Sequence, residues 1–186
     1  RQVDPKHKPQ KWENIRSFTR DTANQYAVMT LNSFTGGRLP SFFKRSFRQL
    51  RKNKIPNLII DIRNNGGDNV SNYTALTKYV REIDFKVCDT MITNTNVLSK
   101  HKKYFKEGLL NSLILLFVSK KGDDGEYHFR YWEKHTFHPR IKNHYKGQVY
   151  VLISGPTFSA STLFAHAVKG QQNVTLLGEE AGGGAY

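Results

Sequence analysis

The apolar positions of the chain first appear as short runs of strand length. Tyr26–Leu31 and Gln148–Ile153 are two of them, and Leu58–Ile62 is a third, nearly continuous run. An apolar run without polar alternation is typical of a strand buried on both faces, as in a parallel sheet. We therefore expect Leu58–Ile62 and Gln148–Ile153 to be buried strands of one sheet.

A helical pattern follows each of these runs. In Ser41–Lys54, Phe and Leu residues recur with the helical period, cations surround them, and Pro40 suits the first turn. Val70–Arg81 carries a second apolar stripe, and Ala160–Val168 a third. Strands that alternate with helices predict an α/β fold, here with a parallel-rich sheet flanked by helices.

Two stretches do not follow this alternation. Residues 1–24 are polar and basic and show no clear period, so we expect a basic arm or linker before a core of residues 25–186. Residues 93–145 give no decisive period either, and we interpret them as an insertion or flap. Within it, Leu109–Val118 suits a helix or a strand equally, and Tyr127–Trp132 alternates like a surface strand.

Phe85–Ile92, just before the expected flap, predicts a further strand. Cys88 lies in this stretch and is the only cysteine of the chain, so no internal disulfide can form. We expect its thiol to pack as a small apolar group rather than to act in catalysis.

Composition narrows the class of protein. The chain has 186 residues of which 38% are hydrophobic, which suits one globular domain. The net charge of +14 favours acidic partners, but lysine and arginine are dispersed, so we expect a solvated basic surface and no nucleic-acid binding.

The longest apolar run, Leu113–Val118, is too short to cross a bilayer, and we expect no stable membrane insertion. Because the chain begins at Arg1 rather than Met, we expect a processed or excised fragment.

Four histidines gather in the expected flap, at His128, His135, His138 and His144. A zinc site needs three or four ligands at characteristic spacings. The spacings here match no helical or finger pattern, so we expect ordinary surface histidines and neither a metal nor a cofactor.

Two turns carry candidate chemistry. Gly66 and Gly67 follow the Leu58–Ile62 strand, and glycines there allow backbone amides to point into a cavity. Ser159 lies between a strand and a buried helix, where free amides and the helix dipole favour a developing negative charge. Each feature alone has a plain alternative: the glycines form an ordinary turn, and Ser159 caps its helix.

Three motifs, in order, resemble those of one peptidase family. They are Ile-Asp-Ile-Arg-Asn-Asn-Gly-Gly at 60–67, Gly-Pro-Thr-Phe-Ser-Ala-Ser at 155–161 and Leu-Gly-Glu-Glu-Ala-Gly-Gly-Gly at 177–184. The family contains the tail-specific, C-terminal processing serine proteases and the core domain of tricorn protease. The resemblance extends over about Tyr26–Tyr186 and implies a ClpP/crotonase-like fold, of which this chain would be an incomplete part.

The resemblance also implies roles for individual residues. Ser159 would be the nucleophile that forms an acyl-enzyme with a polypeptide substrate. The N–H of Ala160 and that of Gly67, or alternatively of Gly66, would form the oxyanion hole. Neither a metal nor a cofactor would take part, and the family places the protein outside the cytoplasm.

The chain departs from the processing proteases at the general base. Those enzymes use a lysine in the closing loop, where this chain has Gly184 and no lysine nearby. The chain instead resembles the tricorn-like branch, in which a histidine activates the serine. His166 is seven residues after Ser159 on one helix, roughly 10 Å along its axis, too far for a base that must approach within about 3 Å. Distance does not exclude the histidines at 128–144, but neither they nor His7 of the basic arm match a motif of the family. In the tricorn-like branch the histidine comes from before the first strand and the acid from beyond the closing loop. The resemblance therefore implies a base before Arg1 and an orienting acid after Tyr186.

The sequence thus predicts a serine endopeptidase whose base lies outside this chain. One alternative is a catalytically inactive peptide-binding module of the same fold. The other is a basic domain that binds nucleic acid or a charged surface. The oligomeric state cannot be predicted from these residues.

Overall fold

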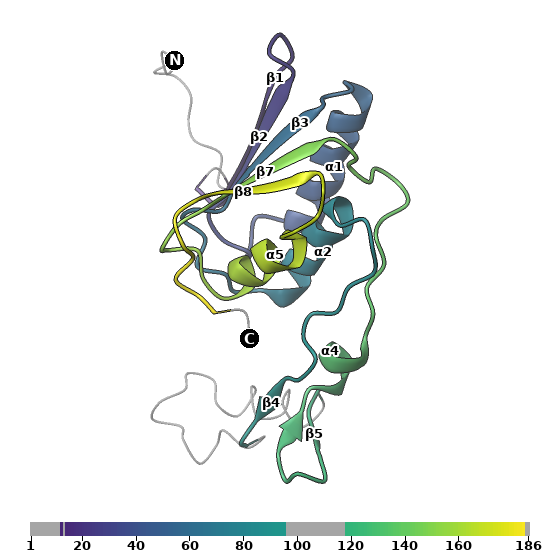
Figure 1. The fold of residues 1–186 in the computed structure, drawn as a ribbon, viewed down its shortest axis with the longest axis vertical. Coiled ribbons are helices and arrows are strands. Elements are labelled where there is room, and N and C mark those ends of the chain that lie inside the picture. The colour runs from purple at the N-terminus through teal and green to yellow at the C-terminus, as the bar shows by residue number, and fades with distance from the viewer. Residues whose placement is uncertain (1–11, 13, 96–117, 185–186) are drawn as a thin grey trace. The chain divides into compact units, whose positions relative to one another are not determined.

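The computed structural model describes residues 12, 14–95 and 118–184. The chain divides into two compact units (Figure 1). The first comprises residues up to 83 together with residues from 138 onward, and the second comprises residues 84–137. Each unit has its own sheet.

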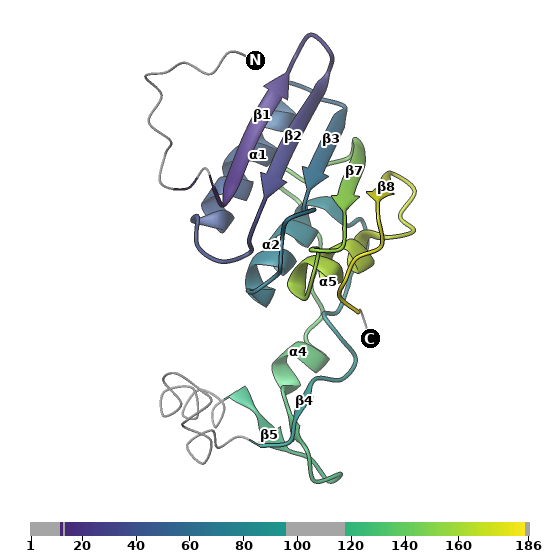
Figure 2. The same ribbon diagram turned by 90° about the vertical axis from the view of Figure 1, so that its left-hand side faces the viewer.

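The first unit is built on a five-stranded sheet (Figure 2). Its strands, in spatial order, are β1 (Arg16–Asp21), β2 (Tyr26–Leu31), β3 (Asn57–Asp61), β7 (Gln148–Ile153) and β8 (Val174–Gly178). β1 is antiparallel to β2, and all other neighbours are parallel. The expectation of an α/β fold with a parallel-rich sheet is confirmed.

Three helices cover one face of this sheet: α1 (Leu39–Lys52), α2 (Val70–Val80) and α5 (Ala160–Val168) (Figures 1 and 2). In β3, Leu58 and Ile60 are fully buried on this side, whereas Ile59 between them is half-buried. The expectation of burial on both faces is therefore wrong for this strand. Its apolar run overstated burial because side chains alternate between faces whatever their polarity.

β1 lies in the stretch where we expected an arm or linker without regular structure. Its sequence, Arg-Ser-Phe-Thr-Arg-Asp, offers one large apolar residue and no alternation to detect. The strand is held by its ladder to β2, with Phe18 opposite Met29 and Arg16 opposite Leu31. An edge strand stabilised by backbone pairing needs little burial and leaves a weak hydrophobic signal.

Within the described residues, the second unit has a small sheet and a short helix. Its strands are β4 (Ile92–Thr93), β5 (Lys120–Lys121) and β6 (Tyr127–His128), in the order β4-β6-β5, and its helix is α4 (Arg130–Lys134). The stretch Leu109–Val118, whose type we left open, lies outside the described residues except for Val118. No helix within the described ranges is long and apolar enough to cross a membrane.

Two strand predictions in this unit are wrong. The strand predicted over Phe85–Ile92 does not form, and only its last residue belongs to β4: Phe85 makes a single bridge with Phe137, and their rings stack 5.5 Å apart. The surface strand expected over Tyr127–Trp132 ends at His128, and α4 starts two residues later. In both places aromatic side chains form a cluster that includes Trp132, and the chain bends to bring them together.

His128 ties the turn before β6 to α4. Its Nε2 lies 2.9 Å from Asp124 Oδ2, and its Nδ1 lies 2.9 Å from Glu133 Oε1. Glu133 also accepts the N–H of Met91 at 2.9 Å. The carboxylates of Asp124 and then Glu133 raise the pKa of His128 above its usual value, because only the imidazolium donates to both.

We expect the stability of this unit to depend on the protonation of His128. Because its folded-state pKa is raised, the stabilisation is complete below its unfolded pKa of about 6.5 and is lost as pH rises through the folded value. The free energy of unfolding of the full-length protein, compared with that of His128→Gln across this pH range, checks this. A difference that is the same at every pH would contradict it.

Candidate active site

A short turn after β3 presents the two glycines. Arg63 donates to both carboxylate oxygens of Asp61, from Nε at 2.9 Å and from Nη2 at 2.8 Å. These bonds lower the pKa of Asp61, so the pair stays ionised at neutral pH. This ion pair holds the first residues of the turn, which continues to Asn65.

Asn65 is fully buried and holds the glycine turn in place. Its Nδ2 donates to Leu31 O at 3.1 Å, at the end of β2. Its Oδ1 accepts the N–H of Gly67 at 2.9 Å. The side chain therefore fixes both the position of the turn and the direction of one glycine amide.

Hydrogen bonds join this turn to the loop after β7. Ile62 N–H donates to Leu152 O at 3.1 Å and continues the ladder between β3 and β7. Thr157, which is fully buried, donates from Oγ1 to Ile62 O at 3.0 Å, and Ser154 Oγ donates to Arg63 O at 2.7 Å. The carboxyl ends of the two strands thus lie side by side, as the oxyanion-hole hypothesis requires.

Ser159 occupies a sharp turn between this loop and α5. Its φ of 52° and ψ of −124° are rare for a residue other than glycine and cost about 1–3 kcal/mol. The residue is exposed, and its side chain makes no capping hydrogen bond to the helix. The alternative in which Ser159 caps the helix is therefore not observed. The turn exposes the residue to solvent, as the nucleophile elbow of hydrolases does.

Gly67 packs directly against Ser159. The φ of Gly67 is +103°, and a Cβ added there would lie 2.6 Å from Phe158 O, 2.7 Å from Ser159 Cβ and 2.8 Å from Ala160 N. Such distances leave no room for a side chain. Glycine at 67 is thus required both by its backbone angle and by this contact.

The glycine-rich loop after β8 reaches the same place. Gly182 N–H donates to Gly155 O at 3.0 Å, and Gly183 N–H donates to Thr157 O at 3.3 Å. A Cβ on Gly183 would lie 3.0 Å from Ser159 N. All three motifs singled out in the sequence therefore converge on Ser159.

Backbone amides without an acceptor are found beside Ser159. Ala160 is the first residue of α5, where an amide has no intrahelical acceptor. Within the described ranges neither Ala160 N–H nor Gly66 N–H donates to another group, whereas Gly67 N–H donates to Asn65. Of the three amides considered from sequence, Gly67 N–H is engaged, and those of Ala160 and Gly66 have no acceptor among the described residues.

No general base contacts Ser159 in the part of the chain that the structure describes. Its hydroxyl has no recorded hydrogen-bond partner there, and His166 is exposed on α5 seven residues further on. His7 lies outside the described residues. Among the described residues, no group of three or more His, Cys, Asp or Glu side chains could hold a metal ion.

A pocket of about 380 Å³ adjoins this site. It is lined by Thr162 of α5, by Lys169 directly after this helix, by Gly183 of the loop after β8, and by the carboxylate residues Glu179 and Glu180. Because Thr162 donates to Thr157 O and Gly183 lies against Ser159, the pocket begins next to the candidate nucleophile.

The sequence predicted the residues that form the candidate site, but not the roles of those that hold it in place. Asn65 and Thr157 were quoted within the motifs, but no role was predicted for either. An Asn just before a Gly-Gly turn is a usable signal, since its side chain commonly bonds to an amide two residues later. The bonds of Thr157 link two loops far apart in sequence, which no local pattern reveals.

The chain matches the family model described as Peptidase family S41 over residues 25–186. It belongs to Peptidase family S41, and the resemblance drawn from the three motifs is confirmed at that level. None of the curated protein sequences gives a significant match.

Solved structures share the fold at low sequence identity. A candidate peptidase from Parabacteroides merdae is 18% identical with a TM-score of 0.60, over 91% of this chain and 44% of that one. Mature CPAF in complex with lactacystin is 15% identical with a TM-score of 0.60, over 84% and 38%. The photosystem II D1 C-terminal processing protease is 16% identical with a TM-score of 0.50, over 84% and 31%. The chain therefore spans less than half the length of these proteins.

Proposed function

We propose that the protein containing this chain is a serine endopeptidase and that Ser159 is its nucleophile. The observation that carries the proposal is the conformation of Ser159: an exposed hydroxyl on a strained strand-to-helix turn, at the N-terminus of α5 and without a capping bond. Strain of this kind persists only where the surroundings impose it, and it gathers at catalytic residues. Membership of Peptidase family S41 supports the same reaction class.

In this mechanism the hydroxyl of Ser159 attacks the peptide carbonyl carbon. The carbonyl oxygen gains negative charge. Backbone amides at the N-terminus of α5 and in the glycine turn stabilise this charge. Ala160 N–H is one donor. In this proposal Gly66 N–H is the second donor, because Gly67 N–H donates to Asn65 and could take that role only if this bond opened.

The general base in this proposal is a histidine from another part of the protein. No base contacts Ser159 Oγ within the described ranges, and the closing loop has no lysine. A histidine with an orienting acid is the arrangement of the tricorn-like branch that the motifs resemble. The base takes the serine proton and returns it to the leaving amine.

The substrate in this proposal is a polypeptide, and no metal or cofactor is required. The pocket of about 380 Å³, whose lining includes Gly183 next to Ser159, offers space for a substrate side chain. A location outside the cytoplasm is the expectation that accompanies the family resemblance.

Labelling by a fluorophosphonate tests the proposal on the full-length protein. Such a reagent forms a stable adduct only with a serine that its own site activates, so we expect one adduct, mapped by mass spectrometry to the peptide that contains Ser159. Heat-denatured protein should not react. Native protein that binds peptides but takes no label would instead support the inactive peptide-binding module.

A further inference from the structure

A second cavity lies at the other end of the sheet from Ser159. Its lining includes Ile55 and Pro56, directly before β3, and Gly147, directly before β7. Ser159 follows the carboxyl ends of these strands. β7 has 6 residues, which at a rise of about 3.3 Å per residue separates the two places by about 20 Å. The cavity is therefore distinct from the candidate active site.

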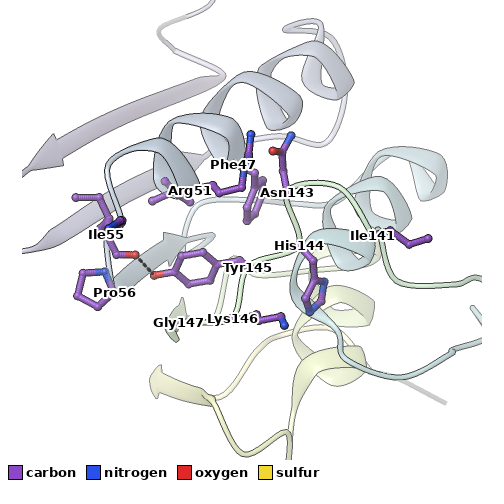
Figure 3. A pocket seen from close by; sticks show the side chains of 12 residues that line it. Phe47, Arg51, Ile55, Pro56, Ile141, Asn143, His144, Tyr145, Lys146 and Gly147 are labelled. Carbon is purple, nitrogen blue, oxygen red and sulfur yellow. Dashed lines mark hydrogen bonds between the residues drawn. The ribbon is translucent and has the colours of Figure 1, made fainter.

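The floor of this cavity is apolar, with Phe47, Ile55 and Tyr145 among its side chains (Figure 3). Its volume of about 530 Å³ is within the usual range for small-molecule pockets. Phe47 and Leu50 come from α1, and the Phe47 ring stacks on Tyr79 at 4.4 Å with an interplanar angle of 2°. Tyr145 OH donates to Ile55 O at 3.1 Å, and burial raises the pKa of this phenol, so it stays neutral.

The rim of the cavity is cationic. Arg51, Lys54 and Lys146 line it and are exposed, and no acidic side chain is among the lining residues. None of the three makes an ion pair within the part of the chain that the structure describes. Unpaired cations around a low-dielectric floor concentrate positive potential, which attracts an anion.

Two polar side chains that line the cavity each have one buried atom without a hydrogen-bond partner among the described residues. Asn143 is 7% exposed, and its Oδ1 is buried without a partner. The neighbouring His144 has a buried, unpaired Nδ1. Unpaired buried polar atoms are unusual in folded proteins and call for an explanation. Both side chains line the cavity, so a bound molecule could supply a hydrogen-bond partner to either of them.

We propose that this cavity binds a small organic anion in which a carboxylate is joined to an aromatic or branched aliphatic body. The body lies on Phe47, Leu50 and Tyr145, and the carboxylate pairs with Arg51, whose planar guanidinium suits bidentate contact. Lys146 supplies the second charge. Arg51 is in the last turn of α1, where the helix dipole is negative, so a single charge is favoured over a multiply charged phosphate.

Calorimetric titration of the full-length protein with naphthoate tests the charge requirement. Naphthoate combines an aromatic body with a carboxylate, and naphthylmethanol is its neutral counterpart of similar shape. We expect naphthoate to bind about tenfold more tightly, since charge-assisted hydrogen bonds are stronger than neutral ones. Equal affinities, or no binding of naphthoate by the full-length protein, would overturn the proposal.

Two double variants with the same loss of charge test the location. Arg51→Gln with Lys146→Gln should reduce naphthoate affinity by about tenfold, to the level of the neutral compound. Lys44→Gln with Arg48→Gln removes two exposed cations of α1 that do not line the cavity, and should change affinity by less than about twofold. If both pairs weaken binding equally, the anion is attracted by net charge alone and the proposed site is wrong.

Discussion

Ser159→Ala should abolish peptide hydrolysis by the full-length protein while leaving its fold intact. Without the nucleophile no acyl-enzyme forms, and serine hydrolases lose about four to six orders of magnitude in kcat on this change. The proposed oxyanion donors are backbone amides and remain in the variant. A peptide cleavage assay, with circular dichroism as the check on folding, measures the effect. Undiminished cleavage by a folded variant would remove Ser159 as nucleophile.

Ser159→Gly separates the catalytic role of this residue from its effect on stability. Alanine at 159 keeps the backbone strain that a φ of 52° imposes, whereas glycine relieves it. We expect both variants to be inactive but Ser159→Gly to be more stable than Ser159→Ala by about 1 kcal/mol in free energy of unfolding. A less stable glycine variant would show that the turn is not strained, which would weaken the proposal of an imposed, catalytic geometry.

The parallel core could be predicted because its signals are local. Tyr26–Leu31 and Gln148–Ile153 form β2 and β7 with the predicted bounds, and Val70–Arg81 is matched by α2 except for its last residue. Burial against helices selects residues with a period, and that period is visible in sequence. β1 and the second unit lack such a periodic pattern. β1 is held by backbone pairing with β2, and the second unit contains a cluster of aromatic side chains.

The same limit applies to the candidate site. Ser159 and the two glycines could be found because their residue types and order carry the chemistry. The bond from Gly67 N–H to Asn65 has a local signal, but the bond from Asn65 Nδ2 to Leu31 O joins residues far apart in sequence, and no local pattern reveals it. The sequence also left the cap alternative for Ser159 open, and this is decided only in the structure, where the side chain makes no capping hydrogen bond.

Gly67→Ala should damage both stability and activity. A methyl group at 67 would lie within 2.8 Å of three atoms, one each on Phe158, Ser159 and Ala160, and two of these are backbone atoms that cannot rotate away. The φ of +103° adds strain for any L side chain. We expect a loss of about 2–4 kcal/mol in free energy of unfolding. Because Ser159 must move, we also expect the rate of fluorophosphonate labelling to fall by at least about a hundredfold.

Gly66→Ala is the matched control for stability. A Cβ on Gly66 meets no atom within 4 Å, and the φ of this residue is not in the left-handed region. Alanine there should change the free energy of unfolding by no more than about 0.5 kcal/mol, or raise it slightly by restricting the unfolded chain. Chemical denaturation of both variants measures the contrast. If Gly67→Ala is as stable as Gly66→Ala and is labelled at the wild-type rate, the close packing of the glycine turn on Ser159 does not exist in solution.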